Sequence, residues 1–330
     1  MEMNLPIILG LFSLASVAIV ASAVYLTTAA DIIAVRMGLG RLWVGSLLLA
    51  GATSLPELAT GVAAALSGAA DLAAGNVFGA NTLNVSKLTV MLALLGGAQV
   101  LQKLAPQQAW LALSAFALTG LATLFAASKA DITLLAVSIP GVVILTAYVI
   151  VSSAVRRFSV AIEEEQSDDV APSHSLRWAW IVFTACAAVI LVSGPLLAIT
   201  AERIADLTGI GASFIGVLAV AFVTSLPELT AVFTALRIGS PDLAVATIYG
   251  TNAFNIAALG VADLFYSGGS LFADVGMSSI SAGLFAVLLT GLGTIQLMKW
   301  GRLRFPLTAS APLFFSIYVL GLFVVFRLAS

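Results

Sequence analysis

Two identical six-residue segments, each with one glutamate, contain the residues of this chain best suited to chemistry. Thr-Ser-Leu-Pro-Glu-Leu at positions 53–58 recurs at 224–229, and both copies lie in long apolar runs. Each copy offers two hydroxyls and a carboxylate, the hard oxygen donors that Ca²⁺ and Na⁺ prefer. A carboxylate in the middle of a membrane helix costs about 2.5–3.5 kcal/mol on insertion scales. We therefore expect Glu57 and Glu228 to bind a charged substrate.

The proline of each copy predicts an interruption of its helix. Proline has no N–H, clashes with the preceding turn and disfavours helical geometry at the residue before it. Backbone carbonyls freed at such a break must be satisfied inside the protein, and a bound cation satisfies them well. The alternative is a helix capping box, because Ser54 and Glu57 have S-x-x-E spacing. A serine cap alone would suffice, so we favour the cation site, and the two roles can coexist.

The composition predicts an all-α polytopic membrane protein. Hydrophobic residues make up 61% of the chain and charged residues 9%, and the mean hydropathy is +1.11, far from the balance of a soluble domain. Segments of about 20 apolar residues can span a bilayer. We predict ten such helices, at 5–29, 42–66, 71–95, 108–128, 131–151, 177–200, 212–236, 242–266, 276–298 and 307–327. The lone cysteine, Cys186, excludes an intramolecular disulfide and a cysteine-based metal cluster.

The two copies belong to a longer repeat. At a constant offset of 171 residues the chain aligns without a gap from Asp31 against Glu202 to Asn84 against Asn255. Each half holds five predicted helices, and an odd number makes the second half enter the membrane from the opposite side. We predict two inverted five-helix repeats with a substrate site between them. The halves are 1–151 and 177–330, joined by an acidic linker at 152–176.

The basic residues predict the orientation in the membrane, since cytoplasmic loops carry an excess of Lys and Arg. One side of the predicted spans holds Arg36, Arg41, Lys103, Arg156, Arg157, Arg177, Arg237, Lys299, Arg302 and Arg304. The other side holds Lys129, Arg203 and Arg327. We expect the first side to be cytoplasmic, with both termini outside, in the inner or plasma membrane of the cell. The linker is then a solvated cytoplasmic loop, with a regulatory cation site as the alternative.

A second pair of polar segments follows the two motifs. Residues 75–84 read Gly-Asn-Val-Phe-Gly-Ala-Asn-Thr-Leu-Asn, and residues 246–255 read Ala-Thr-Ile-Tyr-Gly-Thr-Asn-Ala-Phe-Asn. Asparagines three residues apart share one helical face. They either hydrogen-bond between helices or face the cation cavity, and the neighbouring motifs favour the cavity.

The duplicated motif, followed by these Gly- and Asn-containing segments, resembles the sodium/calcium exchanger branch of the cation/calcium antiporter superfamily. The resemblance implies that Glu57 and Glu228 are the central carboxylates for a divalent ion. It also implies supporting ligands, which are Thr53, Ser54, Thr224, Ser225, the carbonyls of Ala50 and Ala221, and the side chains of Asn84, Thr251 and Asn255.

Three positions depart from the pattern of that family. Ala80 stands in place of a serine, Asn255 stands where many members carry aspartate, and Lys87 stands where relatives have an apolar residue. Lys87 follows Asn84 by three residues and lies on nearly the same face. Its ammonium either snorkels to the membrane surface, occupies the place of a transported cation, or loses its proton and couples transport to pH.

The leading hypothesis is a secondary antiporter that exchanges Ca²⁺ for Na⁺ by alternating access, without a resident cofactor. It would work in the lipid bilayer on small inorganic cations, with no nucleic acid and no obligatory protein partner. An antiporter of the same fold that uses H⁺ or another divalent ion is the closest alternative, and a cation channel is a weaker one. A membrane hydrolase is disfavoured because the sequence has no cluster of His and Cys, so we expect no enzyme activity.

Overall fold

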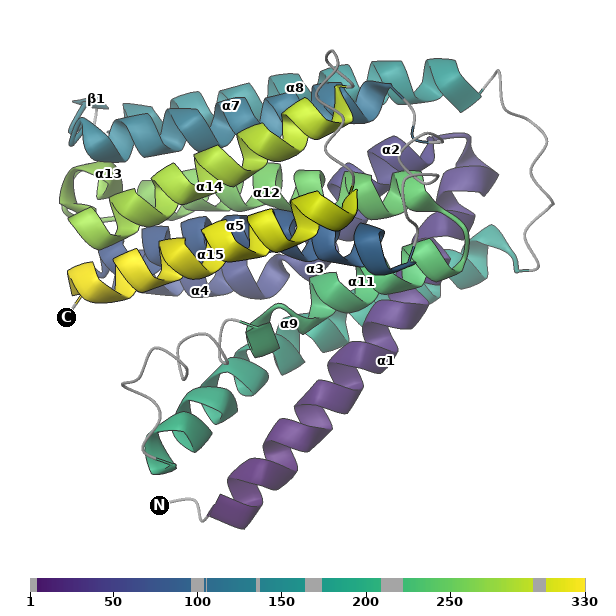
Figure 1. The fold of residues 1–330 in the computed structure, drawn as a ribbon, viewed down its shortest axis with the longest axis horizontal. Helices are drawn as coiled ribbons and strands as arrows, with labels where there is room; N and C mark the ends of the chain where they lie inside the picture. The colour runs from purple at the N-terminus through teal and green to yellow at the C-terminus, as the bar shows by residue number, and fades with distance from the viewer. Residues whose placement is uncertain are drawn as a thin grey trace.

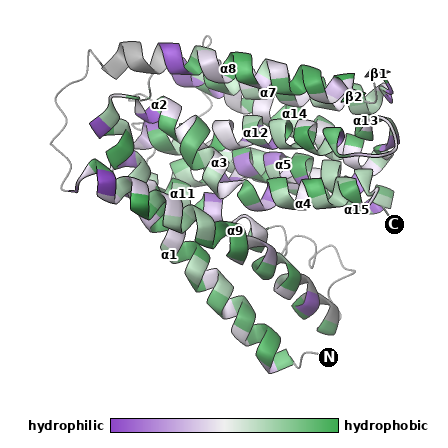
Figure 2. Ribbon diagram, turned by 180° about the vertical axis from the view of Figure 1, so that it is seen from behind, coloured by the Kyte–Doolittle hydropathy of each residue, from purple (hydrophilic) through white to green (hydrophobic). Residues whose placement is uncertain are grey.

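The computed structural model describes residues 5–95, 104, 106–134, 137–163, 174–208, 222–298 and 307–329. Most of the helices run side by side in one bundle, while α1 and α9 cross it obliquely and pack along each other (Figure 1). Apolar residues cover the outer helices (Figure 2). The described part is helical apart from one short two-stranded ribbon.

The elements of the first half follow the predicted order. They are α1 (Leu5–Met37), α2 (Arg41–Trp43), η1 (Val44–Leu49, a π-helix), α3 (Ala50–Thr53), α4 (Leu55–Leu66), α5 (Ala70–Leu95), α7 (Gln107–Ala127), β1 (Thr133–Leu134), β2 (Val137–Ser138) and α8 (Ile139–Glu163). The second half contains α9 (Leu176–Leu207), α11 (Leu226–Arg237), α12 (Pro241–Leu264), α13 (Leu271–Asp274), α14 (Met277–Leu297) and α15 (Leu307–Ala329).

The described residues contain eight helices that are long and apolar enough to cross a membrane, or nine spans if the bent pair formed by Arg41–Thr53 and Leu55–Leu66 is one span. This agrees with a polytopic membrane protein. The predicted span 212–236 begins outside the described residues. The acidic residues of the predicted linker beyond residue 163 also lie outside them, namely Glu164, Glu165, Asp168 and Asp169. The count of ten helices therefore stays a prediction.

Several predicted boundaries were wrong. Helix α1 continues past residue 29 to Met37, where Gly38 with φ of 59° ends it. The helix predicted at 131–151 begins only at Ile139, because residues 133–134 and 137–138 pair as the antiparallel strands β1 and β2. Pro140 explains this start, since proline fits the first turn of a helix and disfavours helical geometry before it. Helix α8 then runs on to Glu163, into the predicted linker.

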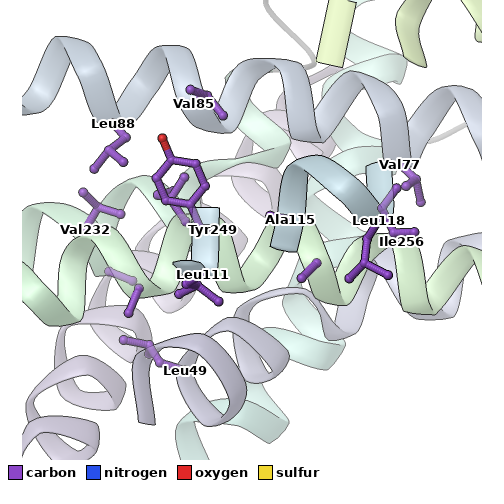
Figure 3. Close-up of a cluster of buried hydrophobic side chains, with 14 of the residues drawn as sticks. Leu49, Val77, Val85, Leu88, Leu111, Ala115, Leu118, Val232, Tyr249 and Ile256 are labelled. Carbon is purple, nitrogen blue, oxygen red and sulfur yellow. The ribbon is translucent and has the colours of Figure 1, made fainter. Parts of the chain in front are cut away.

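Helices α5 and α12 form the centre of the bundle. Within their most apolar stretches 72% and 89% of the residues are buried, against 22–44% for the other single helices that can span a membrane. Tyr249 of α12 lies among Val85 and Leu88 of α5 and Leu111 of α7 (Figure 3). The polar residues of these two central helices are therefore held inside protein and away from lipid.

Hydrogen bonds tie the loops together at the end of the bundle where α12 finishes. The buried carboxylate of Asp263 accepts hydrogen bonds from the hydroxyls of Ser138 and Ser270 and from the backbone N–H of Leu271. Beyond the helix, the hydroxyl of Tyr266 donates to Asp274 Oδ2 at 2.6 Å, and this bond raises the pKa of the phenol to about 12. These carboxylates have structural partners.

Candidate cation site

The predicted interruption of the motif helix is confirmed in the first copy. Helix α3 ends at Thr53 and α4 begins at Leu55, with a bend of 53° between the two parts of the span. Ser54 lies at the break with φ of −97° and ψ of 9°. Ser225 has nearly the same backbone in the second copy, with φ of −90° and ψ of 14°, immediately before α11. The two motifs thus place their serines and glutamates in the same local structure.

The capping-box alternative is not borne out. Neither Ser54 nor Ser225 caps the helix that follows it with its side chain. Ser225 Oγ donates instead to the carbonyl of Phe222 at 2.9 Å, and Ser54 Oγ is buried without a hydrogen-bond partner among the described residues. The first-turn glutamates are therefore not explained by local helix capping.

The predicted ligands at the threonines and alanines of the two motifs are only partly available to an ion. Thr53 is fully buried, and its hydroxyl donates to the carbonyl of Ala50 at 3.1 Å. That carbonyl also accepts the N–H of Ser54 at 3.1 Å, so the break does not leave it free as the sequence argument required. Thr224 lies half-buried beside Ser225, and Ala221 lies outside the described residues. The Thr53 oxygen keeps its lone pairs for a cation, because a hydroxyl both donates and accepts.

Glu228 is buried and Glu57 is half-buried, and the two carboxylates interact with each other electrostatically. Glu228 is 1% exposed, and both of its carboxylate oxygens lack a hydrogen-bond partner among the described residues. Glu57 Oε2 is buried and unpartnered in the same way. Buried charged groups without partners are costly, and they occur where a ligand or ion supplies the missing interaction. The pair has the chemistry of a divalent cation site.

Four asparagines join α5 to α12 through reciprocal hydrogen bonds. Asn81 Nδ2 donates to the carbonyl of Asn252 at 3.0 Å, and Asn252 Nδ2 donates to the carbonyl of Asn81 at 3.3 Å. Asn84 Nδ2 donates to Asn252 Oδ1, and Asn255 Nδ2 donates to Asn81 Oδ1, both at 3.0 Å. Each bond has its counterpart 171 residues along the chain.

Of the two roles that the sequence left open for the asparagines, the interhelical one is confirmed, and the role in the cation cavity stays a prediction. Their amide N–H groups bind the opposite helix, which is the interhelical role. Asn255 Oδ1 and Thr251 Oγ1 nevertheless remain buried and unpartnered among the described residues. Like the carboxylate oxygens, these two oxygens are buried without a hydrogen-bond partner among the described residues.

The first motif packs closely against α12 through glycines. A side-chain carbon at Gly250 would overlap the backbone of Ser46 in η1, and one at Gly45 would lie 2.8 Å from the side chain of Ala246. The π-helix η1 was not predicted, although single π-helical turns often occur at functional sites. The close packing of this segment on α12, but not its π-helical form, could have been inferred from Gly45 and Gly250, because glycines permit close approach of backbones.

Lys87 does not snorkel. The residue is 6% exposed, and Nζ is buried without a hydrogen-bond partner among the described residues. Its charge interacts with Glu228 and Glu57. The described part of the chain contains no group of three or more His, Cys, Asp or Glu that could hold a metal ion. The charged groups of the candidate site are therefore two carboxylates and one ammonium.

Comparison with known proteins identifies the family. The profile of the family described as sodium/calcium exchanger protein matches residues 7–158 and 178–271. The chain belongs to this family. Among individual relatives of this exchanger chain, the inner membrane protein YrbG of Escherichia coli (strain K12) is 28% identical over 241 residues, covering 72% of this chain and 73% of YrbG. The putative antiporter CaxA of Alkalimonas amylolytica is 28% identical over 283 residues, covering 83% of this chain and 86% of CaxA.

The fold of this exchanger-family protein is also that of a solved structure. The sodium-calcium exchanger NCX_Mj, soaked with 10 mM Na⁺ and zero Ca²⁺, superposes with a TM-score of 0.73 at 20% identity, over 96% of this chain and 98% of NCX_Mj. The same exchanger soaked with 2.5 mM Na⁺ and 0.1 mM Ca²⁺ gives a TM-score of 0.72 at 21% identity, over 95% of this chain and 97% of that one. The predicted family and the membrane fold are confirmed.

Proposed function

We propose that this protein is a secondary antiporter that exchanges Ca²⁺ for Na⁺ across the cell membrane by alternating access. The ions are held between the two Thr-Ser-Leu-Pro-Glu motifs. Membership of the sodium/calcium exchanger family supports this proposal, as do the antiporter description of CaxA and the exchanger fold.

The observation that carries the proposal is the unpartnered pair of carboxylates. Glu57 and Glu228 come from two different helix breaks, and three of their carboxylate oxygens are buried without hydrogen-bond partners among the described residues. One Ca²⁺ or two Na⁺ would balance the charge of two carboxylates. A site that two kinds of cation can fill in alternation, but that is costly to leave empty, suits exchange.

The remaining ligands are oxygen atoms around this pair. Ser54 Oγ, Thr251 Oγ1 and Asn255 Oδ1 are buried and unpartnered among the described residues. We assign them to the ion together with Thr53, Thr224, Ser225, Asn84 and the backbone at Ala50 and Ala221. The carbonyl of Ala50 already accepts two hydrogen bonds, so its contribution is the smallest of the set.

We propose that residues 1–151 and 177–330 are the two inverted repeats, with 152–176 as a cytoplasmic connection and both termini outside. The matching breaks at Ser54 and Ser225 and the reciprocal asparagine bonds support this arrangement.

Ion flux in proteoliposomes tests the proposal. The purified protein is reconstituted, and uptake of radioactive Ca²⁺ is measured with an outward Na⁺ gradient, an outward H⁺ gradient, or neither. We expect uptake with the Na⁺ gradient and its loss in Glu57→Gln and Glu228→Gln, because each variant removes half of the charge that balances Ca²⁺. Asp274→Asn is the matched control, since this carboxylate lies at the end of the short helix α13 and accepts a hydrogen bond from Tyr266. Normal uptake in either glutamine variant contradicts the site.

The same assay tests the second candidate, a proton-coupled antiporter of Ca²⁺ or another divalent ion. Lys87 beside the carboxylates and the absence of a third carboxylate at Asn255 favour this alternative. Uptake that follows the H⁺ gradient without Na⁺ would establish it. Uptake that needs no counter-ion on the other side would instead indicate a channel.

A further inference from the structure

The ammonium of Lys87 is a third charge in the site and has no role in the exchange described above. The residue lies in α5, one turn after Asn84, and Nζ is enclosed by protein. Lysine is almost never buried to this extent unless it is paired. No hydrogen-bond acceptor within the described residues binds Nζ, so neither a fixed ion pair nor a backbone contact accounts for its position.

The groups that face this ammonium are the two motif glutamates. Its charge interacts most strongly with Glu228 and also with Glu57. The equivalent position of the second half is Ala258, a buried apolar residue of α12. The ammonium is therefore present on one side of the site only.

The presence of Lys87 changes the charge that an ion meets. Two carboxylates and one ammonium leave one net negative charge, where the carboxylates alone would leave two. A Ca²⁺ ion that joins all three groups would be repelled by the ammonium. The lysine side chain ends in a compact charge on a flexible four-carbon stem, so Nζ can move away without a change in the backbone.

We propose that Lys87 is a tethered monovalent cation, which occupies one cation position of the site and is displaced from the carboxylates when Ca²⁺ enters. This inference rests on the proposed cation site at Glu57 and Glu228. It assigns to Lys87 a role in specificity, because the ammonium competes with every incoming cation and competes most strongly with a divalent one. When Ca²⁺ is absent, the ammonium then neutralises one carboxylate, and one Na⁺ instead of two neutralises the other.

Equilibrium binding measures this competition without transport. Ca²⁺ titrations by calorimetry on the detergent-solubilised full chain compare wild type with Lys87→Met, which keeps the apolar stem and removes the charge. We expect the Kd for Ca²⁺ to fall by about tenfold or more, since the variant removes a like charge that repels the incoming ion inside the protein. Displacement of Ca²⁺ by Na⁺ is expected to change from about one Na⁺ per site to about two.

Three further variants make the result specific. Lys87→Gln repeats the loss of charge with a polar side chain, and Lys87→Arg keeps the charge and is expected to bind Ca²⁺ as weakly as wild type. Lys129→Met removes a lysine whose Nζ donates to the carbonyl of Val275 outside the site, and it is expected to leave Ca²⁺ affinity unchanged. Thermal melting confirms that each variant is folded.

The outcomes separate this inference from the function on which it depends. Equal Ca²⁺ affinity in wild type and Lys87→Met, with binding lost in Glu57→Gln, overturns the role of Lys87 alone. Ca²⁺ binding that survives both Glu57→Gln and Glu228→Gln overturns the site and this inference with it. Failure of both Lys87→Met and Lys87→Gln to fold also overturns the inference, because the ammonium would then be a structural partner of the carboxylates.

Discussion

At the scale of single residues, the site consists of oxygen atoms that the fold leaves without partners. Most other polar groups of the central helices are satisfied, as in the four asparagines that bind across from α5 to α12. The contrast matters because a buried polar atom without a partner is costly and rare in native proteins. Ser54, Glu57 and Glu228 have such oxygens among the described residues, and in the proposed site an ion would satisfy them.

The asparagine bonds predict a measurable stability effect. Asn252→Ala removes the acceptor of Asn84 Nδ2 and the donor to the carbonyl of Asn81, both buried. Leaving such groups unsatisfied costs about 1–3 kcal/mol each. We expect a clear fall in the melting temperature of the detergent-solubilised protein, and a similar fall for Asn81→Ala.

Because both variants break the same network, the double variant Asn81→Ala/Asn252→Ala is expected to lose less than the sum of the single losses. Thr294→Val is the control, since its hydroxyl binds only the preceding turn at Thr290 among the described residues. Strictly additive losses would show that the asparagines do not act as one network.

The sequence singles out the residues of the proposed site, because both the carboxylates and the prolines recur at one offset, and their role in ion binding stays a prediction. The partners of individual atoms were not. The spacing of Asn81 and Asn84 places them on one face of a helix, but it does not tell which amide binds the other helix and which oxygen stays unbound. The same holds for Lys87, whose burial depends on how α5 packs in the bundle.

At the scale of elements, close helix packing positions the break beside α12. Gly250 lies directly against the backbone of Ser46, and Gly51 lies near the ring of Phe254. The helix η1 is π-helical over Val44–Leu49 and then returns to α-helix before the motif. The position of the Thr53–Glu57 oxygens relative to α12 therefore depends on these contacts.

This packing predicts that Gly250→Ala is severely damaging. Its methyl group would overlap the Ser46 backbone, which a side-chain movement cannot relieve. Overpacking of this kind typically costs 1 to 3 kcal/mol, so we expect about that loss of stability together with weaker Ca²⁺ binding. Melting temperature and calorimetric titration measure the two effects.

Gly120→Ala in α7 is the matched control. No described atom lies within 4 Å of a carbon added there, and alanine favours a helix over glycine by about 1 kcal/mol. This variant is expected to be at least as stable as wild type. A Gly250→Ala protein that binds Ca²⁺ normally would show that η1 can shift without moving the site.

Elements defined by local chemistry were predicted better than those defined by packing. Pro56 predicts the break at Ser54, because the restrictions that proline places on the backbone do not depend on the surrounding helices. No residue in the sequence requires the π-helix. The β1–β2 ribbon lies in a segment that is apolar enough to be mistaken for part of a membrane span. Helix α1 is longer than its predicted span of 5–29. Residues 30–37 continue the helix, but they include charged residues, so a prediction based on hydropathy ends before them.

At the scale of the whole molecule, hydrogen bonds join the loops in two separate groups, one at each end of the bundle. At one end the carboxylate of Asp31 accepts hydrogen bonds from Arg41 at 2.7 Å and from Ser240 at 2.8 Å. At the other end the carboxylate of Asp71 accepts the N–H of Gly276 at 2.7 Å. This grouping agrees with the sequence prediction, in which successive loops lie on alternate sides of the membrane.

Cysteine labelling is expected to place these ends on opposite sides of the membrane. After Cys186→Ala, a cysteine at Ser175 should react only with a reagent on the cytoplasmic side, and one at Ser267 only with a reagent outside. Both positions are exposed, whereas Ser270 is fully buried and binds Asp263 and is unsuitable for labelling. Labelling of both positions from one side would contradict the inverted topology.

The reciprocity of the asparagine bonds has a consequence for how such a chain can arise. Every donor in one half finds its acceptor in the other half, and the same is true when the halves are exchanged. A polypeptide containing only one half would leave these amides unsatisfied, but two copies of it inserted in opposite directions would satisfy them all. Two identical subunits could therefore associate through the same four bonds that join the two halves of this single chain.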